Sequence, residues 1–114
     1  MLFAFSIAPV LVDTEDGSMA HIVARAIKVI DDSGLPYQTD AMFTTVEGEW
    51  DEVMPVIKKA TEAIADVSPR VSLVLKADLR SPHADGTPRT RELEGKPQRL
   101  AVQLAQLDYD AATA

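Results

Sequence analysis

The sequence predicts an α+β domain in which two helices cover one face of an antiparallel sheet and a further helix follows at the C-terminal end. Segments with alternating apolar residues, and segments with an apolar residue every three or four positions, come in the order strand, helix, strand, strand, helix, strand. Stretches rich in Pro, Gly and Asp separate them where turns are needed. A chain of 114 residues, 46% hydrophobic and 25% charged, has the size and composition of one globular domain.

The first strand and the first helix are marked by their apolar periods. Residues 2–8 alternate and are largely apolar on both faces, as in a central strand that is covered on both sides. After a turn at residues 13–17, Ser18 stands where the N-cap of a helix belongs. The helix itself is predicted from apolar residues at i, i+3, i+4 spacing, which are Met19, Ile22, Val23, Ala26, Ile27 and Ile30. Gly34 and Pro36 are expected to end it.

The middle of the chain predicts a hairpin and a second helix. Residues 37–48 favour two short strands with a bend near 41–43, and their alternation puts Thr44 and Glu47 on opposite faces. Residues 49–67 follow in helical register, and acids at their start suit the positive end of the helix dipole.

The C-terminal part predicts a strand, a loop and a last helix. Residues 70–78 are the clearest strand in the chain, and residues 80–96, rich in Pro, Gly and charge, read as a long loop. Pro97 is expected to open a helix through Leu100, Ala101, Leu104 and Leu107. Residues 1–107 would then form a single domain, and residues 108–114 a frayed tail.

This βαββαβ order is that of a ferredoxin-like fold, with helices on one face of the sheet only. The uncovered face is not polar enough to remain in water, since it offers apolar residues of the first and last strands in either orientation. We therefore expect a second subunit to cover it, in a homo-oligomer.

Several function classes are excluded by composition. A net charge of −7 argues against nucleic-acid binding, which needs a basic surface. The chain has no cysteine, and His21 and His83 lack metal-ligand spacing. The apolar start, residues 1–12, is too short to span a bilayer and lacks a basic region and a cleavage site. We expect a cytoplasmic protein without a metal or a membrane anchor.

The stretch Thr44-Thr45-Val46-Glu47-Gly48 combines hydroxyls and a carboxylate in a strand. With Met42 beside them, such groups at the rim of an apolar sheet suit a small, flat, hydrogen-bonding ligand. The plainer interpretation is a pair of threonines with β-propensity and an exposed glutamate. Glu47 also begins an acidic cluster that suggests either acid–base chemistry or helix-start electrostatics, and the second interpretation is favoured.

Two stretches of the chain, "SGLPYQTDAMFTTVEGEWDEVMPVIKKATEAI" and "RVSLVLKADLR", resemble the thiamine-binding protein family. These are small ferredoxin-like proteins, and the likeness runs from about residue 3 to 104. The matching features are Ser6-Ile7-Ala8-Pro9, Ser18, the SGL-x-Y run at 33–37, Met42 with Thr44, Glu47-Gly48, and Lys76 with Asp78. Their order and spacing together carry the resemblance.

The resemblance implies non-enzymatic binding of thiamine or its hydroxymethylpyrimidine half, in a dimer or a tetramer built as a dimer of dimers. Site residues carried over from it are Ser18, Met42, Thr44 and Glu47, with Lys76 and Asp78 as weaker candidates. Thr44 and Glu47 would bond the aminopyrimidine edge. The alternative is a structural or regulatory assembly module with a vestigial pocket, favoured by Phe43 where many relatives have glycine. A small cofactor-free monooxygenase is a third class, for which the sequence supplies no acid–base pair.

Overall fold

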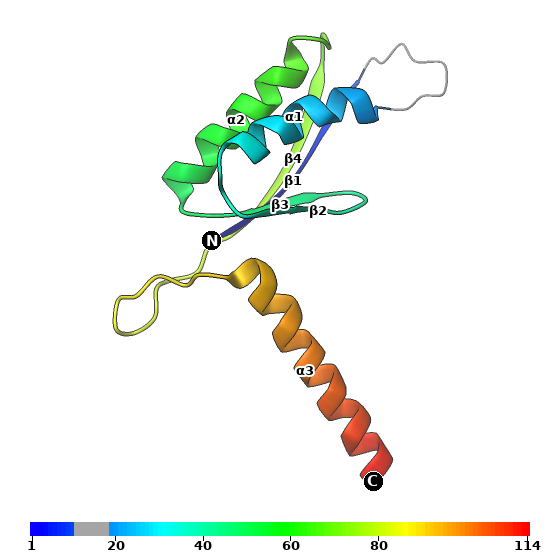
Figure 1. The fold of residues 1–114 in the computed structure, drawn as a ribbon, viewed down its shortest axis with the longest axis vertical. Helices are drawn as coiled ribbons and strands as arrows, with labels where there is room; N and C mark the ends of the chain where they lie inside the picture. Colours follow the sequence, from blue (N-terminus) through cyan, green and yellow to red (C-terminus); the bar gives the residue numbers. More distant parts are fainter. Residues whose placement is uncertain (11–18) are drawn as a thin grey trace.

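The computed structural model describes residues 1–10 and 19–114. Its elements are β1 (Leu2–Pro9), α1 (Ala20–Asp32), β2 (Tyr37–Thr39), β3 (Thr44–Glu47), α2 (Trp50–Ala65), β4 (Val71–Asp78) and α3 (Glu92–Thr113). The strands of the described residues form one antiparallel sheet in the order β2-β3-β1-β4, and α1 and α2 cover one face of it (Figure 1). The predicted α+β, ferredoxin-like βαββαβ fold with a C-terminal helix is confirmed.

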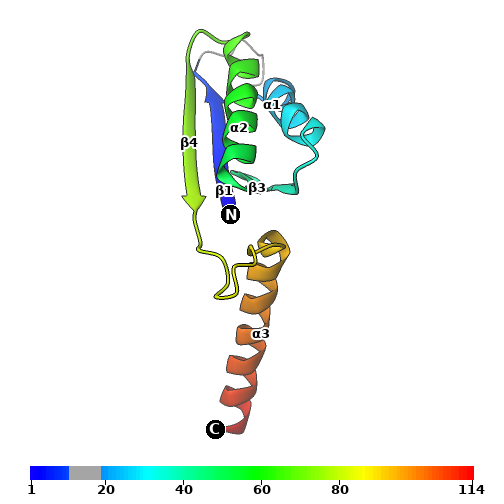
Figure 2. The ribbon, with the colours of Figure 1, turned by 90° about the vertical axis from the view of Figure 1, so that its left-hand side faces the viewer.

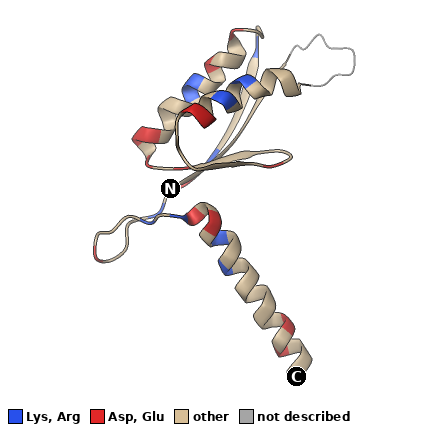
Figure 3. Ribbon diagram, viewed as in Figure 1, with Lys and Arg blue, Asp and Glu red and all other residues tan. Residues whose placement is uncertain are grey.

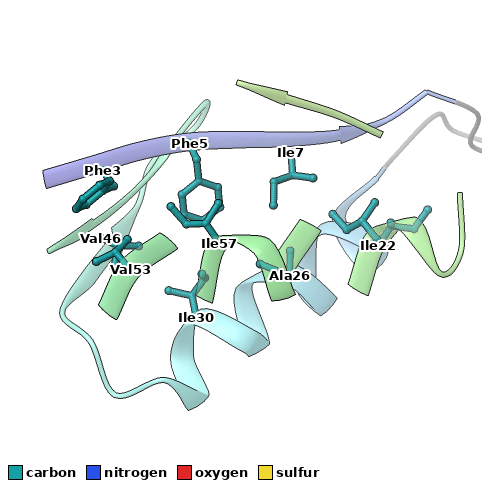
Figure 4. Packing of buried hydrophobic residues seen from close by; sticks show 11 residues of the cluster. Phe3, Phe5, Ile7, Ile22, Ala26, Ile30, Val46, Val53 and Ile57 are labelled. Carbon is teal, nitrogen blue, oxygen red and sulfur yellow. The ribbon is translucent and has the colours of Figure 1, made fainter. Parts of the chain in front are cut away.

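The core lies between the sheet and the two helices. In β1, Phe3, Phe5 and Ile7 point toward the helices and are buried, because alternate residues of a strand share one face (Figure 4). The remaining core residues come from α1, α2 and β3 and are Ile22, Ala26, Ile30, Val46, Val53, Ile57, Ala60 and Ile64. The apolar stripes that predicted both helices are therefore the surfaces they bury.

Both helix boundaries near the hairpin have local causes. Gly34 follows α1 with φ of 76°, a left-handed conformation that glycine adopts without steric cost, and this confirms its predicted role at the helix end. At the start of α2, the backbone N–H of Glu49 donates to the Glu52 carboxylate over 3.1 Å. These acids cap the helix, as the electrostatic interpretation predicts. Ser18, the expected cap of α1, lies outside the described residues.

The last helix differs from the prediction. Residues 92–96, expected in the loop, are helical, so α3 begins at Glu92 and carries Pro97 in its second turn. The cause is a tertiary contact, because the Glu47 carboxylate accepts hydrogen bonds from the backbone N–H groups of Glu92 (2.8 Å) and Leu93 (3.1 Å). A side chain from β3 thus caps the first turn of α3. At the other end α3 continues past Leu107 to Thr113.

The second face of the sheet is not covered by either α1 or α2. Along β1 and β4 this open face carries Leu2, Ala4, Ser6, Ala8, Ser72, Val74, Lys76 and Asp78. Helix α3 does not lie over it but leads away from the Glu47 end of the sheet (Figures 1 and 2). The chain therefore has an open sheet face and a projecting helix.

Candidate functional site

A cavity of about 230 Å³ lies where the bend between β2 and β3 approaches α1 and β1. Its walls are mostly apolar, and the described residues that line it are Phe5, Ser6, Ile7, Ala8, Met19, Val23, Ala26, Ile27 and residues 39–44. The bend is closed by a hydrogen bond of 2.8 Å from the Asp40 N–H to the Phe43 carbonyl. We refer to this site as the hairpin cavity.

Two threonine hydroxyls supply the hairpin cavity with paired polar groups. The Oγ1 atoms of Thr39 and Thr44 are 3.0 Å apart, across the β2–β3 pair, and Thr44 is only 4% exposed. One hydroxyl of such a pair donates to the other, so the accepting hydroxyl keeps its own hydrogen for a further partner. The pair can therefore both donate to and accept from a ligand. Thr39 was missed in the sequence, where no signal distinguishes it from an ordinary strand threonine.

The outer wall of the hairpin cavity is formed by Met42 and Phe43. The Met42 side chain is 78% exposed, so it stands at the rim. A polarisable thioether and an aromatic ring are both suited to contact the face of a flat heterocycle. Met42 and Thr44 are thus brought together as the sequence predicts. Ser18 lies outside the described residues, and its neighbour Met19 lines the cavity.

Glu47 does not join Thr44 in this cavity. The two residues are three positions apart on β3, and residues separated by an odd number of positions point to opposite faces of a strand. Both carboxylate oxygens of Glu47 hold the first turn of α3, and the residue is 7% exposed. The arrangement makes Glu47 the anchor of α3.

Lys76 and Asp78 are on the open sheet face, also away from the hairpin cavity. They border a hollow of about 360 Å³ with Leu2, Ala4 and Thr45. Asp78 forms an ion pair with Lys96 of α3, and the Lys96 ammonium lowers the pKa of the Asp78 carboxyl. The six predicted site residues therefore do not converge on one place.

A larger cleft of about 700 Å³ separates the start of α2 from residues 88–94. Charged residues are part of its lining, and Figure 3 marks charged positions at the start of α2 and in the segment before α3. They are the carboxylates Glu47, Glu49, Glu52 and Glu94 and the guanidinium groups of Arg89 and Arg91. Within residues 1–10 and 19–114, no three His, Asp or Glu side chains come together as a metal site would require.

Sequence comparison places the chain among known proteins. The sequence pattern of a family described as thiamine-binding protein matches residues 3–94. A UPF0045 protein of Mycobacterium bovis is 53% identical over 81 residues, which cover 70% of this chain and 76% of the relative. A UPF0045 protein of Clostridium perfringens is 29% identical over 72 residues, 62% of this chain and 76% of the relative.

Solved structures share the fold. A protein of Methanocaldococcus jannascii superposes with a TM-score of 0.68 at 29% identity, covering 84% of this chain and 94% of that one. A Thermotoga maritima protein, provisionally assigned to thiamine biosynthesis or salvage, gives 0.65 at 27% identity, with coverage of 83% and 95%. Among the described residues, no helix has the length and apolar character needed to cross a bilayer.

Proposed function

Because this chain belongs to the thiamine-binding protein family, we propose that it binds thiamine or the hydroxymethylpyrimidine half of thiamine in the hairpin cavity, in the cytoplasm and without catalysis. The observation that carries the proposal is the buried Thr44 hydroxyl, paired with Thr39 over 3.0 Å in a mostly apolar cavity. A few placed polar groups in an apolar cavity are the usual form of a small-molecule site. An aminopyrimidine edge presents a donor beside an acceptor, which matches the threonine pair.

The size of the hairpin cavity favours the pyrimidine half as the part that is enclosed. At about 230 Å³, it is smaller than the pockets of about 300–1,000 Å³ that enclose drug-sized ligands. A single substituted ring is of the right scale. The thiazolium half would extend past Met42 at the rim, where it remains in contact with water.

Binding without turnover is supported by the ionisable groups around the cavity. Of the described residues that line it, Asp40 alone is ionisable. General acid–base catalysis usually requires a donor and an acceptor that are both held near the reacting atoms. A lone carboxylate beside a bend does not supply that pair.

The proposal is tested by calorimetric titration of the protein with thiamine, hydroxymethylpyrimidine and thiamine phosphate. We expect saturable binding of the first two, weakened about tenfold by Thr44→Val, because that change removes one hydroxyl and keeps the shape of the side chain. Thr45→Val is the matched control, since Thr45 is the next residue and faces the other side of the sheet. If Thr44→Val binds thiamine and hydroxymethylpyrimidine as tightly as Thr45→Val and the parent protein do, Thr44 is not part of the site.

A second candidate is the assembly module with a vestigial pocket, which the position of Phe43 favours. Phe43 lines the hairpin cavity, so its ring takes up space that a glycine at this position would leave to a ligand. Flat titrations with all three compounds, in a protein that still self-associates, would select this candidate over ligand binding.

We also propose that the protein is a homo-oligomer, a dimer or a tetramer, in which a second copy covers the open sheet face. Val74 lies on that face and is 54% exposed in the single chain. A second copy over this face would remove its apolar residues, Leu2, Ala4, Ala8 and Val74, from water.

A further inference from the structure

The projecting helix α3 is the most exposed apolar element of the described chain. It is 22 residues long, and Glu92 is its one buried residue. Leu100, Leu104 and Leu107 are all more than half exposed. A single helix of this length is only marginally stable in water unless it buries an apolar face.

The exposed leucines form one stripe. The half-buried Leu93 and the exposed Leu100, Leu104 and Leu107 follow each other at spacings of seven, four and three, which places them on one side of the helix. Residues 100–107 are without charge, and the charges beyond them are acidic. An anionic membrane surface would repel such a helix, because interfacial helices carry basic residues on their polar face. A protein surface is the better match.

We propose that α3 of one chain packs on the open sheet face of a second copy, and that the two copies exchange their helices reciprocally. This inference rests on the proposed self-association and names the element that covers the sheet. One contact then buries two exposed surfaces, the leucine stripe of α3 from one copy and the open sheet face of the other. If a two-fold axis relates the two copies, the same contact forms twice, and no other surface is needed to close the dimer.

Length and charge order support this placement. The helix is about 33 Å long at 1.5 Å per residue, and the eight-residue strands β1 and β4 are about 27 Å long. The N-terminal end of α3 is placed at the Asp78 end of the partner's sheet. The uncharged turns 100–107 then cross Ala4, Ala8 and Val74. The acids Asp108 and Asp110 reach the end where Arg70 precedes β4.

The area is sufficient for a stable dimer. Half the lateral surface of a cylinder about 10 Å wide and about 33 Å long is about 500 Å². Two helices and the two sheet faces beneath them would bury about 2,000 Å² in total, which is at the upper end of standard stable interfaces.

The first experiment measures mass in solution by sedimentation of the full chain at micromolar concentration. We expect an oligomer of the 12.4 kDa chain that Leu100→Lys with Leu104→Lys weakens about a hundredfold or more, because two buried leucines are replaced by charge. Val102→Lys with Tyr109→Lys is the matched control, as these exposed residues lie off the stripe. A monomeric parent protein would overturn both the self-association and this inference. An oligomer that the leucine substitutions leave intact would overturn only the role of α3.

The second experiment identifies the surface that α3 meets. The chain has no cysteine, so Val74→Cys combined with Leu104→Cys gives two unique thiols. Oxidation should yield a covalent dimer from this double variant and not from Leu104→Cys alone. A dimer from Leu104→Cys alone would mean that two α3 helices pair with each other. An intrachain disulfide would mean that α3 folds back on its own sheet, and either result overturns the proposal. None of these outcomes decides whether thiamine binds, because the titration tests the hairpin cavity and not the contact of α3.

Discussion

Replacement of Glu47 by alanine should release the N-terminal turn of α3 while the rest of the domain stays folded. The Glu47 carboxylate holds the N–H groups of Glu92 and Leu93 at 2.8 and 3.1 Å, from a position that is 7% exposed. Alanine offers neither acceptor. The core between the sheet and α1 and α2 contains no residue of α3, so its packing is unchanged.

The expected cost follows from the two bonds. Hydrogen bonds to a charged group contribute about 1.5–3 kcal/mol each, and loss of a helix cap costs about 0.5–2 kcal/mol. Two such bonds would together contribute about 3–6 kcal/mol. Because the two N–H groups share one carboxylate and one of them is only part-buried, we expect the lower end of that sum, about 3 kcal/mol. With each 1.4 kcal/mol worth a factor of ten, opening of this turn becomes about 100-fold more frequent.

Hydrogen exchange of the amides of Glu92 and Leu93 measures this opening directly. Glu47→Gln should give an intermediate effect, since the amide keeps one acceptor and loses the charge. Asp51→Asn serves as control, because it removes the same charge from an exposed position in α2. Exchange at Glu92 and Leu93 that is unchanged in Glu47→Ala, or equally changed in Asp51→Asn, would refute the assignment of Glu47 as the anchor of α3.

Three further predictions concern Gly48, Gly95 and pH. Gly48→Ala should lower the free energy of unfolding by about 1–3 kcal/mol, because a Cβ there would meet the buried Val53 Cγ2 at 2.8 Å. Gly95→Ala should instead stabilise α3 by about 1 kcal/mol, since only the flexible end of the Arg99 side chain is close to the added Cβ. Denaturant unfolding measures the effect of Gly48→Ala, and hydrogen exchange within α3 measures the effect of Gly95→Ala. A hydrogen bond from Arg99 holds the pKa of Glu92 below its ordinary value of 4.5, so its contribution is present above that value and is lost as pH falls through the folded-state pKa. Opening at the start of α3, measured as exchange relative to the intrinsic rate at each pH, should rise in that acidic range, and less so in Arg99→Gln.

Much of the fold was predictable because its causes are local. The alternation in β1 and the i, i+3, i+4 spacing in α1 and α2 are properties of neighbouring residues, and they led to the correct element order. The bend before Thr44 and the end of α1 at Gly34 were also readable, since Gly34 has the left-handed backbone that the prediction requires.

The site was predictable in part. Met42 and Thr44 line one cavity because both lie at the bend between β2 and β3, which the sequence places near residues 41–43. Their partner Thr39 came from the neighbouring strand, and the register that aligns Thr39 with Thr44 is set by pairing across the hairpin.

What the sequence alone determined about this protein is the order and the periodic faces of its elements, because each period depends on residues only a few positions apart. The tertiary structure decided where α3 begins, since its first turn is capped by Glu47, 45 positions earlier in the chain. It also decided that Glu47, Lys76 and Asp78 lie away from the hairpin cavity. Such contacts depend on how strands and helices are placed side by side, and no local pattern of residues records that placement.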